Sequence, residues 1–129
     1  MRRAGLVVVF LWFAIGGVAH FTHTDAFVRI VPPWVPWPRA AVLGTGALEL
    51  LGAAGLVFAR TRRAAGLGLL ALTVAVTPAN VHVLQRAELF ESVPYWALVA
   101  RLPLQVALLA LIAWSVGLLG ARRSRDDRR

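Results

Sequence analysis

Glu49 is the residue whose type and position most clearly suggest chemistry. It is the single charged residue in an apolar run of the chain, residues 40–59. A helix through this run would place the carboxyl group about 14 Å deep in a membrane, at about 1.5 Å per residue. An ionisable group at that depth costs roughly 2.5 kcal/mol or more and normally faces the interior of the protein. Such a carboxyl group can exchange protons with a bound molecule, or it can simply hydrogen-bond one helix to another.

Five further polar residues fall in the same half of the apolar runs as Glu49: His20, Asn80, His82, Arg101 and Gln105. We predict Glu49 and His20 as catalytic residues and the other four as ligand-binding residues. Arg101 and Gln105 are one helical turn apart and therefore share a face. On a regular helix Asn80 and His82 point about 200° apart, so only a bend at Pro78 would bring both to one site.

A quinone, or a similar apolar ring with carbonyl groups, suits this set of residues. Such a ligand needs an apolar slot, a polar donor and an acid for proton exchange. A sterol or another hydrophobic molecule would need much the same pocket. The cofactor therefore stays unknown, with quinone as the favoured candidate.

Metal binding is a second interpretation of the same residues. His20, His23, His82 and Glu49 would be acceptable ligands for zinc, copper or iron, although their spacing gives little support. Haem would need an axial histidine inside the membrane, and these histidines lie near its edge. The chain contains no cysteine, which excludes thiolate metal sites, iron–sulfur clusters and thiol catalysis. It also has no glycine-rich phosphate loop, which argues against nucleotide chemistry.

Four apolar spans must position these residues. Hydrophobic residues make up 59 % of the 129 residues and charged residues only 16 %, which excludes an ordinary soluble domain. The spans lie near residues 4–20, 40–59, 64–83 and 102–120, each about long enough to cross a bilayer. We predict an all-α protein, an integral membrane four-helix bundle forming one domain over residues 1–121. Residues 122–129 should form a basic, disordered cytoplasmic tail.

The arginines predict the direction of the spans. Ten of the fourteen arginines would lie on the side of the two termini and four on the other, so the positive-inside rule makes both termini cytoplasmic. The expected location is the cell (inner) membrane, with the lipid bilayer as the first partner. Because the arginines stand between apolar runs, nucleic acid is not expected to bind. Arg2 and Arg3 before the first run would also fit a signal peptide, but three more spans follow it.

Smaller features predict how the spans are joined and packed. The prolines between Phe27 and Pro38 favour a stiff, extended path. Pro103 is expected in the first turn of the fourth helix, where proline is tolerated. Small residues should form the contacts between helices, both beside Glu49 and at the pairs Gly55/Ala59, Ala64/Gly68 and Ala113/Gly117.

Short motifs recur in an order that resembles a known family. They are Gly16-Gly17-x-x-His20-Phe21, Pro33 and Pro36, Gly46-x-x-Glu49, Pro78-Ala79-Asn80, Arg101-Leu102-Pro103-Leu104-Gln105 and Ala113-Trp114. In this order the chain resembles the DoxX-like family of small four-helix membrane proteins, from Leu6 to Trp114.

The resemblance implies a membrane subunit or accessory protein for quinone-linked redox chemistry. The expected partners are a hydrophobic small molecule such as quinone and a redox partner protein or a second copy of the chain. The alternative is a non-catalytic binder of a lipid-like molecule, or an assembly factor for a membrane complex. The sequence leaves open whether the protein is an enzyme.

Overall fold

The computed structural model describes residues 1–119, in which all regular secondary structure is helical and there is no strand. Its long segments are α1 (Arg2–Thr22), α3 (Pro38–Val57), α4 (Arg62–Ala75) continued by α5 (Thr77–Gln85), and α6 (Tyr95–Ser115). A short helix α2 (Thr24–Ile30) follows α1, and a 3-10 turn η1 (Ala87–Phe90) follows α5. By length and composition, four of these segments could cross a membrane. The predicted tail, residues 122–129, lies outside the described residues.

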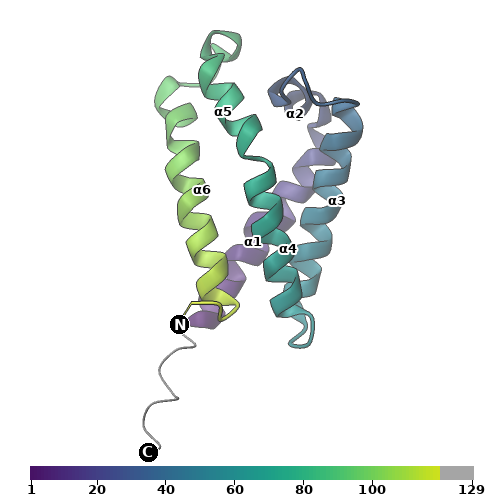
Figure 1. Ribbon diagram of the computed structural model, residues 1–129, viewed down its shortest axis with the longest axis vertical. Coiled ribbons are helices and arrows are strands. Elements are labelled where there is room, and N and C mark those ends of the chain that lie inside the picture. The colour runs from purple at the N-terminus through teal and green to yellow at the C-terminus, as the bar shows by residue number, and fades with distance from the viewer. Residues whose placement is uncertain (120–129) are drawn as a thin grey trace, which may run out of the picture.

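The long helices pack in a closed ring (Figure 1). Helix α1 contacts α3 and α6, and α4 contacts the same two helices from the other side. Residues 1–3, the α3–α4 turn at 58–61 and residues 116–119 lie together at one end, which we call the terminal end. Helix α2 and η1 lie at the opposite end, the α2 end (residues 23–37 and 86–94).

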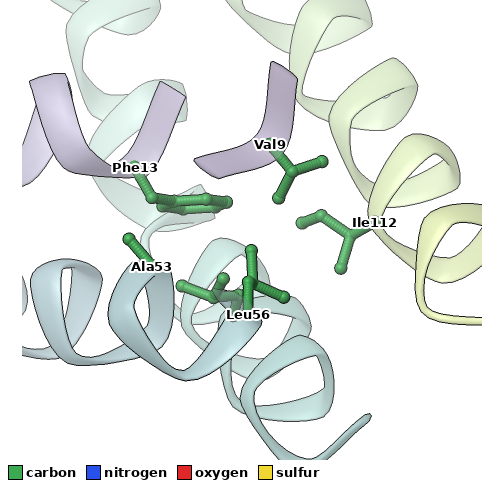
Figure 2. Packing of buried hydrophobic residues seen from close by; sticks show 6 residues of the cluster. Val9, Phe13, Ala53, Leu56 and Ile112 are labelled. Atoms are coloured by element: carbon green, nitrogen blue, oxygen red, sulfur yellow. The ribbon is translucent and has the colours of Figure 1, made fainter. Parts of the chain in front are cut away.

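The apolar core lies in the half of the molecule near the terminal end (Figure 2). It consists of Val9, Phe13, Ala53, Leu56, Leu69 and Ile112. Outside this cluster most large apolar side chains point outward, and only 28 % of the apolar stretch of α1 and 11 % of that of α6 are buried. An apolar outer surface of this extent is the kind of surface that lipid can cover.

Glycines bring α1 and α3 into close contact. A Cβ atom on Gly46 would lie 2.5 Å from the Cβ of His20, and one on Gly17 would lie 3.0 Å from the carbonyl oxygen of Gly46. Larger residues would therefore force the two backbones apart. Similar close approaches occur at Gly5 against α6, at Gly52 against α4 and at Gly66 beside Val116.

The predicted small-residue pairs are only partly right. Gly55 does contact Ala65 across the α3–α4 turn. Gly68, however, faces open space, and Gly117 follows the end of α6 with a φ of 81°. Glycine at position 117 therefore permits the left-handed backbone conformation that ends the helix and does not form a contact between helices.

Two predicted boundaries were wrong. Helix α6 begins at Tyr95, seven residues before the predicted span, so Pro103 lies inside the helix and leaves the carbonyl of Val99 without its usual donor. The stiff, extended path predicted from Phe27 is not formed: Phe27–Ile30 belong to α2, and residues 31–37 form turns and bends, with a hydrogen bond from Val35 N–H to the carbonyl oxygen of Pro32. A proline restricts only itself and the residue before it, and the first proline of this stretch is Pro32.

We predict that Gly46→Ala destabilises the protein by about 1–3 kcal/mol, the usual cost of overpacking. The matched control is Gly44→Ala in the same helix, where an added Cβ meets nothing within 4 Å. There alanine should be neutral or stabilising, because glycine disfavours helix. Thermal unfolding of both variants in detergent is the measurement. Equal melting temperatures would contradict the close α1–α3 contact.

Candidate functional site

A cavity of about 620 Å³ lies in the half of the molecule near the α2 end. Residues from α1 through α6 line it, and most of the lining is apolar. The polar residues of its wall are His20, Thr45, Glu49, Thr73, Asn80, Arg101 and Gln105. A mostly apolar cavity of this size with a few polar groups is typical of sites for small organic ligands.

The structure brings five of the six predicted site residues to this cavity: His20, Glu49, Asn80, Arg101 and Gln105. The exception is His82, which lines a second, more open depression beside the cavity; the two hollows share Pro32, Trp34 and Pro78. Although the helix is broken before Pro78, Asn80 and His82 both lie within the regular helix α5 and point to different sides. The break therefore does not bring the two residues together.

His20 and Glu49 face each other across the α1–α3 contact. The distance from His20 Nδ1 to Glu49 Oε2 is 3.6 Å, and the same nitrogen lies 2.9 Å from the carbonyl oxygen of Gly16. A carbonyl oxygen only accepts hydrogen bonds, so Nδ1 carries the proton and Nε2 is left as an acceptor in the neutral ring. His20 therefore offers the cavity an acceptor nitrogen.

Helix α2 holds the imidazole ring of His20 in place. The ring of Phe27 stacks on it with centroids 4.1 Å apart. Thr24 Oγ1 donates to the carbonyl oxygen of His20 at 2.8 Å, which ties the first turn of α2 to the end of α1. The short helix that the sequence analysis missed is thus what orients a predicted site residue.

The carboxyl group of Glu49 is largely shielded and incompletely bonded. Its side chain is 14 % exposed, and Oε2 is buried without a hydrogen-bond partner among the described residues. A Cβ on Gly16 would lie 3.0 Å from Oε2, so glycine at that position leaves room for the carboxyl group. A buried oxygen without a partner is costly, and a polar group of a ligand would relieve that cost.

Gln105 ties α6 to the interruption between α4 and α5. Its Nε2 donates to Thr77 Oγ1 at 2.5 Å and to the carbonyl oxygen of Thr73 at 3.1 Å. Its Oε1 accepts from Asn80 Nδ2 at 2.5 Å. The N–H groups of Gln105 are therefore already used within the protein, and a structural role accounts for much of this residue.

Arg101 lies one turn before Gln105 on the same face of α6 and is partly buried at the cavity wall. Among residues 1–119, no carboxylate lies within 4.0 Å of its guanidinium group. The other arginines of this end differ. Arg39 pairs with Asp25 at 2.8 Å and Arg86 with Glu88 at 2.7 Å, both on the exposed surface.

The predicted metal ligands His20, His23, His82 and Glu49 do not come together at one site. In the part of the chain that the structure describes, no three His, Cys, Asp or Glu side chains lie close enough together to hold a metal ion. His23 is exposed and contacts the hydroxyl group of Thr22, away from His20 and Glu49. His82 lies in the second depression.

Comparison with known proteins places the chain in a family without an assigned function. A family model described as a domain of unknown function, DUF8561, matches residues 9–117. The chain belongs to the DUF8561 family. No curated protein matches it, and no solved structure does. The resemblance to the DoxX-like family therefore stays a prediction.

The DUF8561 match includes the whole cavity, whose lining extends from Trp12 to Leu108. The sequence analysis did not predict two residues of the cavity wall, Phe27 and Thr73, or Thr77, which lies outside the wall and accepts a hydrogen bond from Gln105. Thr73 and Thr77 are four residues apart and precede Pro78, a pattern that indicates polar bracing of an interrupted helix. For Phe27 the sequence offers no comparable signal, since its role depends on the fold of α2.

Proposed function

We propose that this DUF8561 protein is a multi-pass protein of the cell (inner) membrane, a four-helix bundle with both termini cytoplasmic. Four helical segments have the length and composition for crossing a membrane. Among the described arginines, five lie near the terminal end and four near the α2 end. The remaining five, Arg122 to Arg129, lie outside the described residues but in sequence follow the terminal end. The total of ten to four supports cytoplasmic termini.

A cysteine-labelling experiment tests this orientation, and the native chain contributes no background because it has no cysteine. Glu91→Cys at the α2 end and Ala59→Cys in the α3–α4 turn are both exposed positions. In intact cells an impermeant maleimide should label Glu91→Cys and leave Ala59→Cys unlabelled until the cells are lysed. The reverse pattern would overturn the proposed orientation.

We further propose that the cavity binds a quinone, and that the protein serves quinone-linked redox chemistry as a membrane subunit or accessory protein. The observation that carries this proposal is the His20–Glu49 pair in the wall of an otherwise apolar cavity. Apolar side chains would hold the ring and its tail, while the carboxyl and imidazole groups exchange protons with the ring oxygens. The order of motifs that resembles the DoxX-like family supports the same role.

The chemistry balances only with a partner. Reduction of a quinone to a quinol takes up two electrons and two protons. Glu49 in its acid form can pass one proton to a ring oxygen, and His20 can pass the second from its imidazolium form, in which Nε2 also carries a proton. The electrons would come from a redox partner protein. In this scheme Glu49 and His20 are the catalytic residues, and Asn80 lies in the same wall to orient the ring.

The test is quinone binding by the purified full-length protein in nanodiscs. Trp12 and Trp34 line the cavity, so decylubiquinone should quench the tryptophan fluorescence. Glu49→Gln, which keeps the shape of the side chain, should weaken binding at least about tenfold, or about 1.4 kcal/mol. The control is Glu91→Gln at an exposed position. Equal affinities of Glu49→Gln and the native protein would refute the proposed role of Glu49.

A second candidate is a non-catalytic binder of a lipid-like molecule, or an assembly factor for a membrane complex. It is favoured by the exposure of three residues in the cavity wall: Trp12, Ile15 and Leu104 are 51 %, 68 % and 53 % exposed. The cavity is thus continuous with the outer apolar surface. On this alternative, Glu49→Gln and His20→Ala lower protein abundance or the recovery of partners while quinone-dependent turnover stays unchanged.

A further inference from the structure

Arg101 combines three properties that no other arginine of residues 1–119 combines. It is partly buried, it lines the large cavity, and it has no carboxylate within 4.0 Å. Arg39 and Arg86 are exposed and paired with acids of their own. Arg29 is exposed on α2 and does not line the cavity. Arg101 therefore presents a cation to an apolar space.

Such a cation gains free energy when an anion joins it. A charge held at an apolar wall has lost part of its hydration, and a buried charge is normally paired. The planar guanidinium group matches a carboxylate or phosphate with two parallel hydrogen bonds. In the described residues the nearest acidic side chain of the cavity, Glu49, is not within ion-pair distance. A bound anion can supply the negative charge that no side chain of the described residues places next to Arg101.

The surroundings of Arg101 define the rest of such a ligand. On the same helix, Leu104 and Leu108 continue the wall from Arg101 toward the terminal end, and Trp12 and Ile15 of α1 also line the cavity. Leu104 and Ile15 are also exposed on the outer surface. An alkyl chain could lie along these residues and leave the cavity between α1 and α6 toward lipid.

We propose that Arg101 is the headgroup site for an anionic amphiphile, a molecule with one carboxylate or phosphate group on an alkyl chain. The headgroup pairs with the guanidinium group of Arg101, and the chain lies against the apolar wall. This inference rests on the proposed function in one respect, that the cavity holds a ligand. It does not depend on that ligand being a quinone or on proton exchange by Glu49.

The experiment compares three probes that share one alkyl chain: dodecanoate, dodecyl phosphate and dodecanol. Binding to the full-length protein in nanodiscs of phosphatidylcholine is followed by tryptophan fluorescence. The native protein should bind dodecanoate and dodecyl phosphate at least about tenfold more tightly than dodecanol, since a hydrogen bond between two charged groups is stronger than one to a neutral hydroxyl group. Equal binding of dodecanoate and dodecanol would overturn the proposal.

The variants locate the effect. Arg101→Gln should reduce dodecanoate binding to the level of dodecanol, and Arg101→Lys, which keeps the charge but loses the planar fork, should give an intermediate affinity. Arg86→Gln is the control for a lost positive charge at the same end of the molecule. If Arg86→Gln weakens dodecanoate binding as much as Arg101→Gln does, the proposal is wrong. If Arg101→Gln does not fold, the proposal is tested by Arg101→Lys and by the comparison of the three probes on the native protein.

Glu49→Gln separates this inference from the quinone proposal. Glutamine cannot carry a negative charge, so this variant should leave dodecanoate binding unchanged or make it tighter, whereas it should weaken decylubiquinone binding. If Glu49→Gln binds decylubiquinone as tightly as the native protein does while the preference for dodecanoate over dodecanol persists, only the quinone proposal is contradicted.

Adding phosphatidylglycerol to the nanodiscs identifies the source of the anion. If a membrane lipid supplies the headgroup, this lipid competes with dodecanoate in the native protein and not in Arg101→Gln. If the anion belongs to a free amphiphile, the affinity for dodecanoate does not change.

Discussion

Glycine at positions 17 and 46 lets the backbones of α1 and α3 come close enough for His20 to face Glu49. Gly16, one residue before this contact, leaves the space that the carboxyl group occupies. In an apolar helix a carboxyl group is costly to leave in apolar surroundings, and here the neighbouring helix shields it. The contact therefore does two things at once. It joins two helices, and it holds an incompletely bonded carboxyl oxygen at the wall of a cavity.

The rest of the molecule divides into a packed half and a half that contains the cavity. Near the terminal end, Val9, Phe13, Leu56 and Ile112 pack together, and α1 lies against α6 at Gly5. Near the α2 end the helix is interrupted between α4 and α5, and Gln105 donates hydrogen bonds to Thr73 and Thr77 on the two sides of this interruption. Gln105 bonds to Asn80 and Thr77 of α5 and to Thr73 of α4. The polar groups with most capacity for a ligand are therefore those of His20, Glu49 and Arg101. They come from three different helices.

Much of this arrangement could be predicted from the sequence, because membrane helices follow simple rules of length and polarity. The helical spans are visible as apolar runs, and the helical repeat alone places Arg101 and Gln105 on one face. The opposite directions of Asn80 and His82 follow from the same repeat. These predictions needed only local geometry.

Other features could not be predicted because they depend on tertiary contacts. Helix α6 starts at Tyr95 and includes Arg101. The predicted span begins only at Leu102, because the apolar run without a charge begins after Arg101. The stacking of Phe27 on His20 requires the fold of α2. The use of Gln105 as a brace for the α4–α5 interruption requires knowing that the two helices are neighbours. From the sequence alone, a glutamine that braces the fold cannot be distinguished from a glutamine that binds a ligand.

The cavity near the α2 end is proposed to hold an apolar or amphipathic small molecule. Native mass spectrometry of the full-length protein, purified from its own membrane, can detect such a molecule. We expect one small molecule bound per chain, and its loss from Ala79→Trp, which fills the cavity, but not from Ala71→Trp on the exposed side of α4. A native protein without any bound molecule, or equal occupancy in both tryptophan variants, would show that the cavity does not hold a ligand.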